Sequence, residues 1–264
     1  MTKYEILRVM LKHRYAHRGL HNKPTIPENS MAAFKLAVEN GFGIELDVHL
    51  TKDGKLAVIH DNSLKRTCGV DINVEDLTLA EAQMYFLEES QERIPELSEV
   101  LELVAGKVPL IVELKVGTNK YGYDVTEVLC YTAAGELDRY NETYGSTGLG
   151  EECLYCVESF SPNAMKWFKL HRPDIVRGQL GGNINHDKKT ITPFQNFLVR
   201  NLFINRISEP DFVAYNYRDR KDPGLRRYTG PLFYYTIKKY EDLKGLERQG
   251  AAGIFEQFNP KDFE

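Results

Sequence analysis

Strand-like and helix-like segments alternate along almost the whole chain, and this alternation restricts the possible folds more than any other feature. The expected strands are 15–19, 43–50, 55–61, 109–115, 154–160, 174–180, 212–217, 231–237 and 253–258. The expected helices are 30–41, 78–87, 97–107, 124–140, 162–171 and 239–249. Roughly eight strands that alternate with helices predict an α/β fold of the TIM (β/α)8 barrel type. An open doubly wound sheet is the alternative, and no G-x-G-x-x-G fingerprint supports it.

The segment 182–230 breaks this alternation in the C-terminal half. Its middle part has apolar residues at helical spacing, which are Phe194, Phe197, Leu198 and Leu202. A long insertion beside the strand ends of a barrel is often a lid over the binding site, so we interpret the segment as a lid-like insertion. An extra helix packed on the barrel is an equal alternative. We expect residues 1–264 to form a single domain.

Charge and composition exclude several classes of function. The net charge is −4 and the isoelectric point is about 6.0, so the chain lacks the basic footprint of a nucleic-acid-binding protein. The N-terminus has no continuous apolar stretch typical of a signal peptide, and no segment approaches the about 18 apolar residues of a membrane span. We therefore expect a cytoplasmic protein.

Cys153 and Cys156 have CxxC spacing, but residues three apart on a strand face opposite sides, so we interpret them as core residues.

Polar residues gather at the expected carboxyl ends of the strands, where barrel enzymes have their active sites. In strand order they are His17-Arg18, Glu45 and Asp47, His60-Asp61, Glu113 and Lys115, and Glu158. Glu45 and Asp47 are two residues apart, so both side chains leave the same face of their strand. Together with Glu113 they would place three carboxylates in one barrel mouth, which could stay ionised only beside a cation. Oxygen ligands without thiolates select Mg²⁺, Ca²⁺ or Mn²⁺.

The basic residues of this set indicate a phosphate ester as the substrate. Arg18 and Lys115 more than balance the charge left by three carboxylates and a divalent ion, which leaves room for an anion. His17 and His60 titrate near neutral pH, so they can act as general base and general acid. Taken singly, a histidine at a strand end is often structural, and a Glu-x-Asp pair can be a surface ion pair. Their coincidence at strand ends favours metal-assisted cleavage of a phosphoester.

Three runs of the sequence, AHRGLHNKPTIPENSMAAF, IELDVHLTKDGKLAVIHD and LIVELK, resemble the glycerophosphodiester phosphodiesterase family. The shared elements are His-Arg-Gly, Pro-Glu-Asn-Ser, Glu-x-Asp, His-Asp and Glu-x-Lys, in order within residues 15–115. The resemblance implies a TIM barrel, a divalent metal ion that is commonly Ca²⁺ or Mg²⁺, and hydrolysis of a small-molecule glycerophosphodiester to glycerol 3-phosphate and an alcohol. It also implies roles for matching residues: metal ligands Glu45, Asp47 and Glu113, catalytic His17 and His60, and phosphate-binding Arg18 and Lys115.

The resemblance leaves some residues with two interpretations. Glu28 and Asn29 could support substrate binding, or they could cap the helix that begins near Ser30. Tyr235-Thr236 stands where family members often have Trp-Thr, and Glu256 stands where the last strand often ends in Asp, so the preference for the leaving alcohol is open.

Two other functions fit the same barrel. One is lysophospholipase D-type cleavage, in which the apolar residues around Phe194–Phe203 would cover an acyl chain or make a peripheral contact with a membrane surface. The other is a non-catalytic barrel that only binds a phosphodiester. Binding alone would not need an acid and a base, so the presence of both histidines argues against the second.

Overall fold

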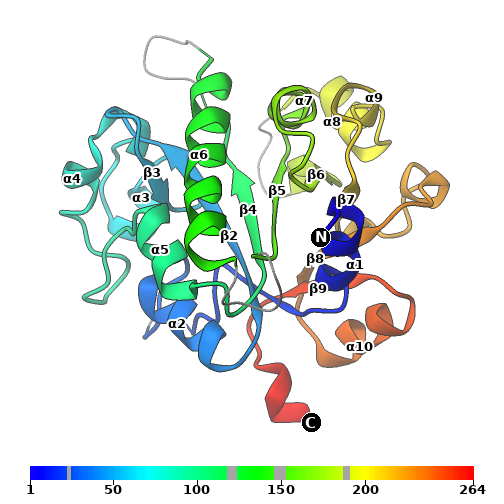
Figure 1. The fold of residues 1–264 in the computed structure, drawn as a ribbon, viewed down its shortest axis with the longest axis horizontal. Coiled ribbons are helices and arrows are strands. Elements are labelled where there is room, and N and C mark those ends of the chain that lie inside the picture. The colour runs from blue at the N-terminus through cyan, green and yellow to red at the C-terminus, as the bar shows by residue number, and fades with distance from the viewer. Residues whose placement is uncertain (23–24, 118–123, 146–152, 187–190) are drawn as a thin grey trace.

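The chain folds into a closed barrel of parallel strands with helices outside it, as a computed structural model shows for residues 1–22, 25–117, 124–145, 153–186 and 191–264 (Figure 1). The barrel strands are β1 (Tyr15–His17), β2 (Gly43–Leu50), β4 (Leu110–Leu114), β5 (Tyr155–Ser159), β6 (Arg177–Gly181), β7 (Phe212–Asn216), β8 (Leu232–Ile237) and β9 (Ala252–Phe255). The first strand pairs with β2 on one side and with β9 on the other, so the sheet closes on itself. The predicted (β/α)8 barrel is confirmed.

Most of the connecting helices lie where the sequence pattern predicts them. They are α2 (Met31–Glu39), α5 (Leu97–Val104), α6 (Thr126–Tyr144), α7 (Pro162–His171) and α10 (Tyr240–Arg248). An additional helix, α1 (Lys3–Met10), precedes the barrel and adds Leu7 and Met10 to the apolar cluster inside it. No helix within the described ranges is both long and apolar enough to cross a membrane.

Side chains alternate between the inside and the outside of the barrel, and this alternation positions the site. Ile44 and Leu46 of β2 point outward into the cluster shared with the helices. The intervening Glu45 and Asp47 therefore point inward. The same rule separates the two cysteines of the CxxC run, because Cys153 belongs to the outer cluster and Cys156 to the inner one. Both thiols are buried and free, as expected for core residues.

The strand expected at 55–61 does not belong to the barrel. Its regular part, β3 (Leu56–Val58), runs antiparallel to β2, with Val48 opposite Val58. The turn at Asp53-Gly54 causes this, because a tight hairpin can join only antiparallel strands. The chain then forms α3 (Lys65–Cys68), η1 (Val74–Asp76) and α4 (Leu79–Ala82), which surround a separate small apolar cluster. The helix expected at 78–87 is thus only one turn long.

The segment 182–230 contains parts of the barrel itself rather than one inserted unit. It holds η2 (Ile184–His186), α8 (Pro193–Arg200) and α9 (Asn205–Ser208), which connect β6 to β7, then β7, and then η3 (Tyr217–Asp219) and η4 (Leu225–Arg227). α9 packs beside α7 in the outer layer (Figure 1). Among the described residues, none from α8 or α9 lines the cavity at the barrel mouth. The arrangement of these two helices corresponds to the alternative of helices packed on the barrel.

Candidate active site

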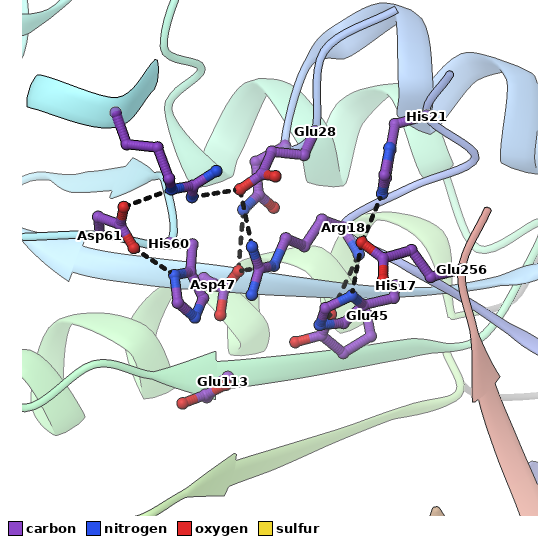
Figure 2. Close-up of polar contacts among 12 residues, drawn as sticks. His17, Arg18, His21, Glu28, Glu45, Asp47, His60, Asp61, Glu113 and Glu256 are labelled. Carbon is purple, nitrogen blue, oxygen red and sulfur yellow. Dashed lines mark hydrogen bonds and ion pairs between the residues drawn. The ribbon is translucent and has the colours of Figure 1, made fainter. Parts of the chain in front are cut away.

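A cavity of about 440 Å³ opens at the carboxyl ends of the barrel strands. Its walls include His17, Arg18, Glu45, His60, Glu113 and Lys115, which are six of the nine residues expected in the site. The other three, Asp47, Glu28 and Asn29, are buried immediately behind them. The structure therefore brings all nine predicted residues together, although they come from five separate parts of the chain. Figure 2 shows most of them, including the facing side chains of Arg18, Asp47 and Glu28.

Three buried carboxylates form the acidic part of the site. Glu45 and Asp47 project from β2, and Glu113 lies opposite Asp47 on β4 in the parallel register. One oxygen from each carboxylate lies within 4.8 Å of an oxygen of the other two. Burial and the neighbouring carboxylates raise the pKa of Glu45 well above its usual value, and burial also raises the pKa of Glu113. Ionising these buried carboxyl groups therefore costs free energy. A bound cation would lower that cost by neutralising their charge.

Lys115 and Arg18 supply the positive charge next to this cluster. The Lys115 Nζ atom lies 2.9 Å from Asp47 Oδ1 and 2.7 Å from Glu113 Oε1. Arg18 Nε lies 3.4 Å from Asp47 Oδ2. Burial by itself would raise the pKa of Asp47, but Lys115, His60 and Arg18 outweigh it and hold that pKa well below its usual value. Among the three carboxylates, Asp47 is thus the one whose ionised form its surroundings favour most.

The backbone turns sharply after β1 so that Arg18 can face the carboxylates. Arg18 has a φ of 55° and Gly19 a φ of 79°, and a Cβ at Gly19 would lie 2.8 Å from the Cβ of Ala33. The turn directs the Arg18 amide N–H to Glu45 Oε2 at 3.1 Å. The Arg18 side chain donates from Nη1 to Glu28 Oε1 at 2.7 Å. The His-Arg-Gly sequence therefore fixes both the backbone and the side chain of the arginine.

Glu28 and Asn29 take part in the polar network of the site. Glu28 accepts from Arg18 and, at 2.6 Å, from Arg66 Nη2. Asn29 donates from Nδ2 to Asp47 Oδ2 at 2.9 Å. The helix cap is provided instead by Ser30, whose Oγ accepts from the amide of Ala33.

His60 is held by a hydrogen bond to Asp61, which forms an ion pair with Arg66, and the sequence did not predict this chain of contacts. Its Nδ1 lies 2.6 Å from Asp61 Oδ1, and Arg66 Nε lies 2.5 Å from the other oxygen of Asp61. Since Asp61 is ionised, Nδ1 carries the hydrogen and the neutral ring keeps Nε2 as an acceptor. Burial, and then Lys115, lower the pKa of His60 to about 4. The imidazole is consequently neutral at pH 7 and able to accept a proton.

His17 contacts acidic groups on both sides of its ring. Its Nε2 lies 3.9 Å from Glu45 Oε2, and its Nδ1 lies 3.8 Å from Glu256 Oε1. Glu256 also lies 3.4 Å from His21 Nε2 and 3.4 Å from Lys238 Nζ. Burial and Arg18 lower the pKa of His17, while Glu256 opposes this shift. Glu256, which the sequence left without a role, is therefore a neighbour of a predicted catalytic residue.

One part of the cavity wall is aromatic and uncharged. It includes Phe160, directly after β5, with Leu180, Asn216, Tyr217 and Tyr235 from the second half of the barrel. Tyr235 donates from its hydroxyl to the Gly181 carbonyl oxygen at 2.8 Å, and its ring meets Phe160 edge to face. The exposure of these side chains to the cavity could not be read from the sequence, because apolar and aromatic residues at strand ends look like core residues.

The residues present fit a divalent cation. The cluster offers three carboxylates, no thiolate and no imidazole, which is the donor set of Mg²⁺, Ca²⁺ or Mn²⁺. Asn29 Oδ1 is also buried without a hydrogen-bond partner among the described residues, so a further neutral oxygen is present beside Asp47.

The barrel, the carboxylate cluster and the paired histidines define a class of protein, the (β/α)8-barrel phosphodiesterases. Within this class, the model of the glycerophosphoryl diester phosphodiesterase family matches residues 17–258. The chain belongs to this family.

Individual relatives agree with this assignment. The chain is 48% identical over 253 residues to a glycerophosphodiester phosphodiesterase of Caldanaerobacter subterraneus subsp. tengcongensis, which covers 90% of this chain and 91% of the relative. It is 36% identical over 135 residues to human lysophospholipase D GDPD1, which covers 46% of this chain and 42% of the relative. A phosphodiesterase of Oleispira antarctica, solved with the product sn-glycerol-3-phosphate, has a similar fold, with a TM-score of 0.70 at 22% identity over 92% of both chains.

Proposed function

We propose that this enzyme hydrolyses glycerophosphodiesters to glycerol 3-phosphate and an alcohol. The observation that carries the proposal is the meeting of two histidines, three carboxylates and two cationic side chains at one cavity. The relative that is 48% identical is named for this activity. The acidic cluster supports a divalent cation held by Glu45, Asp47 and Glu113, which on binding would polarise a phosphoryl oxygen and lower the pKa of an attacking hydroxyl.

His17 and His60 are the proposed acid–base pair. His60 fits the base, because it is neutral and Asp61 stabilises the imidazolium that forms when Nε2 accepts a proton from the attacking hydroxyl. His17 fits the acid that donates a proton to the departing alkoxide. Glu256 beside His17 Nδ1 opposes the lowering of the His17 pKa by burial and Arg18, and so supports the protonated ring that this role needs.

Arg18 and Lys115 are the proposed phosphate-binding residues. Both line the cavity, and both are already oriented by carboxylates behind them. Glu28 and Asn29 would act by orienting other site residues. Glu28 accepts a hydrogen bond from Arg18, and Asn29 donates one to Asp47. Groups oriented before the substrate arrives lose less conformational entropy on binding and stabilise the transition state better.

A substrate and metal screen tests the proposal. The purified enzyme, stripped of metal with EDTA, is assayed on a panel of glycerophosphodiesters with added Mg²⁺, Ca²⁺ or Mn²⁺, and glycerol 3-phosphate is quantified. We expect release of glycerol 3-phosphate that depends on one of these ions. Full activity in the stripped enzyme would remove the cation from the proposal, and absence of glycerol 3-phosphate from every substrate would overturn the activity.

A second candidate function is lysophospholipase D-type cleavage. Two observations favour it: the likeness to lysophospholipase D GDPD1 over part of the chain, and the exposed rings of Phe194, Phe197 and Phe203, which could make a peripheral contact with a membrane. These rings lie outside the described lining of the cavity, so we rank this function second. Cleavage of lysophosphatidylcholine without cleavage of glycerophosphocholine would reverse the ranking.

A further inference from the structure

One carboxyl group at the cavity has no counterpart in the site described so far. Glu158, on β5, is 1% exposed and lines the cavity. Its Oε2 atom is buried and has no hydrogen-bond partner among the described residues. A carboxyl group removed from water without a partner is unfavourable in a folded protein, so its presence calls for an explanation.

The register of the sheet places Glu158 next to the proposed cation ligands. Asp47 of β2 lies opposite Glu113 of β4, and Glu113 lies opposite Glu158 of β5. All three side chains point into the barrel, because their neighbours Ile111 and Cys156 belong to its interior cluster. Three adjacent strands therefore present a row of carboxyl groups at one level of the barrel mouth.

Including Glu158 leaves more carboxylates than cationic side chains in this region. Glu45, Asp47, Glu113 and Glu158 carry four negative charges when ionised. Arg18 and Lys115, which contact three of these four residues, can offset at most two of them. Arg18 also contacts Glu28, whose second partner Arg66 is shared with Asp61. The ionised carboxylates therefore leave an excess of negative charge, which a divalent cation would reduce.

We propose that Glu158 is the fourth carboxylate of the cation site and that it makes the site prefer Ca²⁺ to Mg²⁺. This inference rests on the proposed function, because it extends the same cation site. Ca²⁺ takes six to eight oxygen ligands in flexible geometry, whereas Mg²⁺ keeps several waters and uses only one or two carboxylates. A buried group of four carboxylates, three of them in one row and Glu45 beside it, suits the larger ion.

The test measures metal binding directly, without an assay of turnover. Calorimetric titrations with Ca²⁺ and with Mg²⁺ are performed on EDTA-stripped wild type and on the Glu158→Gln variant. We expect Glu158→Gln to raise the Kd for Ca²⁺ about tenfold or more, and the Kd for Mg²⁺ by less. Equal Ca²⁺ affinity in the two proteins would overturn the role of Glu158, and an equal loss for both ions would overturn the preference. A wild type that binds neither ion would instead refute the cation of the proposed function.

Glu136 offers a matched control. It is a second buried glutamate, 5% exposed, whose Oε2 lacks a hydrogen-bond partner among the described residues, but it lies on α6 in the outer layer. Removing an unpartnered carboxyl should raise the Tm of the metal-free protein in both Glu158→Gln and Glu136→Gln. Only Glu158→Gln should reduce the further rise in Tm that Ca²⁺ produces. An unchanged Ca²⁺-induced shift in Glu158→Gln would contradict the inference.

A substrate-binding role is the competing explanation for Glu158. In that case Glu158→Gln would bind Ca²⁺ like wild type but would show a raised KM, which counts against the inference. If Glu158→Gln does not fold, as judged by circular dichroism, Glu158→Asp keeps the charge on a shorter side chain. We then expect a loss of Ca²⁺ affinity of severalfold, and wild-type affinity would overturn the proposal.

Discussion

The two halves of the barrel differ in what they bring to the cavity. The segments from β1 to β5 contribute both histidines and the lining carboxylates of the acidic cluster, as His17, His60, Glu45, Glu113 and Glu158, together with Arg18 and Lys115. The segments from β6 to β9 contribute apolar, aromatic and amide side chains beside separate charged residues, among them Leu180, Asn216, Tyr217, Tyr235 and Lys238, with Glu256 reaching back to His17. We infer that the first half performs the phosphoester chemistry and that the second half selects the alcohol.

The largest expected effect comes from the histidines of the first half. His17→Ala or His60→Ala should each lower kcat about 10²–10⁴-fold, since each removes a general acid or base. Metal binding, followed by calorimetry, should be largely intact because neither histidine belongs to the carboxylate cluster. The control is His171→Ala, which changes an exposed histidine at the end of α7. Turnover near the wild-type rate in either cavity variant would refute the acid–base assignment.

A smaller loss is expected when Arg18 is replaced by lysine. The guanidinium reaches Glu28 and Asp47 at once, and an ammonium cannot reproduce this forked geometry. We expect kcat/KM to fall about 10–100-fold, which corresponds to about 1.4–2.7 kcal/mol. Steady-state kinetics checks this value.

Arg172 provides the matched control for Arg18. It also contacts two carboxylates, Asp138 and Asp174, but it lies on the outer surface at the end of α7. Arg172→Lys should leave kcat/KM unchanged and should cost at most about 1 kcal/mol of stability. Equal kinetic losses in Arg18→Lys and Arg172→Lys would show that the effect is one of stability rather than of position at the barrel mouth.

The aromatic wall, where Phe160 from the end of β5 meets Tyr235 of the second half, should respond with a change in selectivity rather than in rate. Phe160→Ala removes an aromatic ring from the cavity wall and leaves the Tyr235 ring without its edge-to-face partner. We expect KM to rise severalfold for substrates with a large alcohol, while kcat for the smallest alcohol stays within about twofold. The measurement is kcat and KM across a series of alcohols of increasing size.

Phe194→Ala serves as the comparison for Phe160→Ala. Phe194 is 68% exposed on α8 and lies outside the described lining of the cavity. Its loss should not alter the hydrolysis of small glycerophosphodiesters. A larger effect from Phe194→Ala than from Phe160→Ala would mean that the segment 182–230 acts on the substrate after all.

The difference between the halves also explains how far the sequence could be interpreted. In the first half, acids and histidines interrupt apolar strands. Because side chains alternate between the two faces of a strand, the sequence predicts which of these residues point into the barrel. That rule places Glu45, Asp47 and Glu113 together, as the structure has them. In the second half, Leu180 and Tyr235 face the cavity but resemble the apolar and aromatic residues around them, so periodicity cannot distinguish them from core residues.

Other features were not predictable because they depend on contacts between distant segments. The chain of polar contacts from His60 through Asp61 to Arg66 and Glu28 requires the small cluster around β3, whose antiparallel path replaces the barrel strand expected there. Glu158 was visible as a polar strand end, but its lack of a partner is a property of the folded chain. Solvation and pairing of a charge are decided by packing, which a single sequence does not specify.

Replacing a buried acid outside the cavity should have the smallest effect on activity. It therefore tests whether position at the barrel mouth, rather than burial, makes an acid important. Glu136 lies on α6, which connects β4 to β5 in the first half. Burial, with Glu96, raises the pKa of Glu136 from 4.5 to about 7. The folded protein therefore keeps this proton to a higher pH than the unfolded chain does. The free energy of unfolding is greatest while Glu136 is protonated in both states, and it falls as pH rises through about 4.5 to 7.

Glu136→Gln should remove this pH-dependent loss. We expect the variant to be more stable than wild type by about 1–3 kcal/mol at pH 8 and equal to it below about pH 4.5, with kcat/KM unchanged. Urea denaturation at several pH values measures the difference, and kinetics at the same pH values measures activity. A stabilisation that does not vary with pH would contradict the titration, and a loss of activity would contradict the division between the cavity and the outer layer. If both expectations hold, the importance of an acid in this half of the barrel follows from its position at the strand ends and not from burial alone.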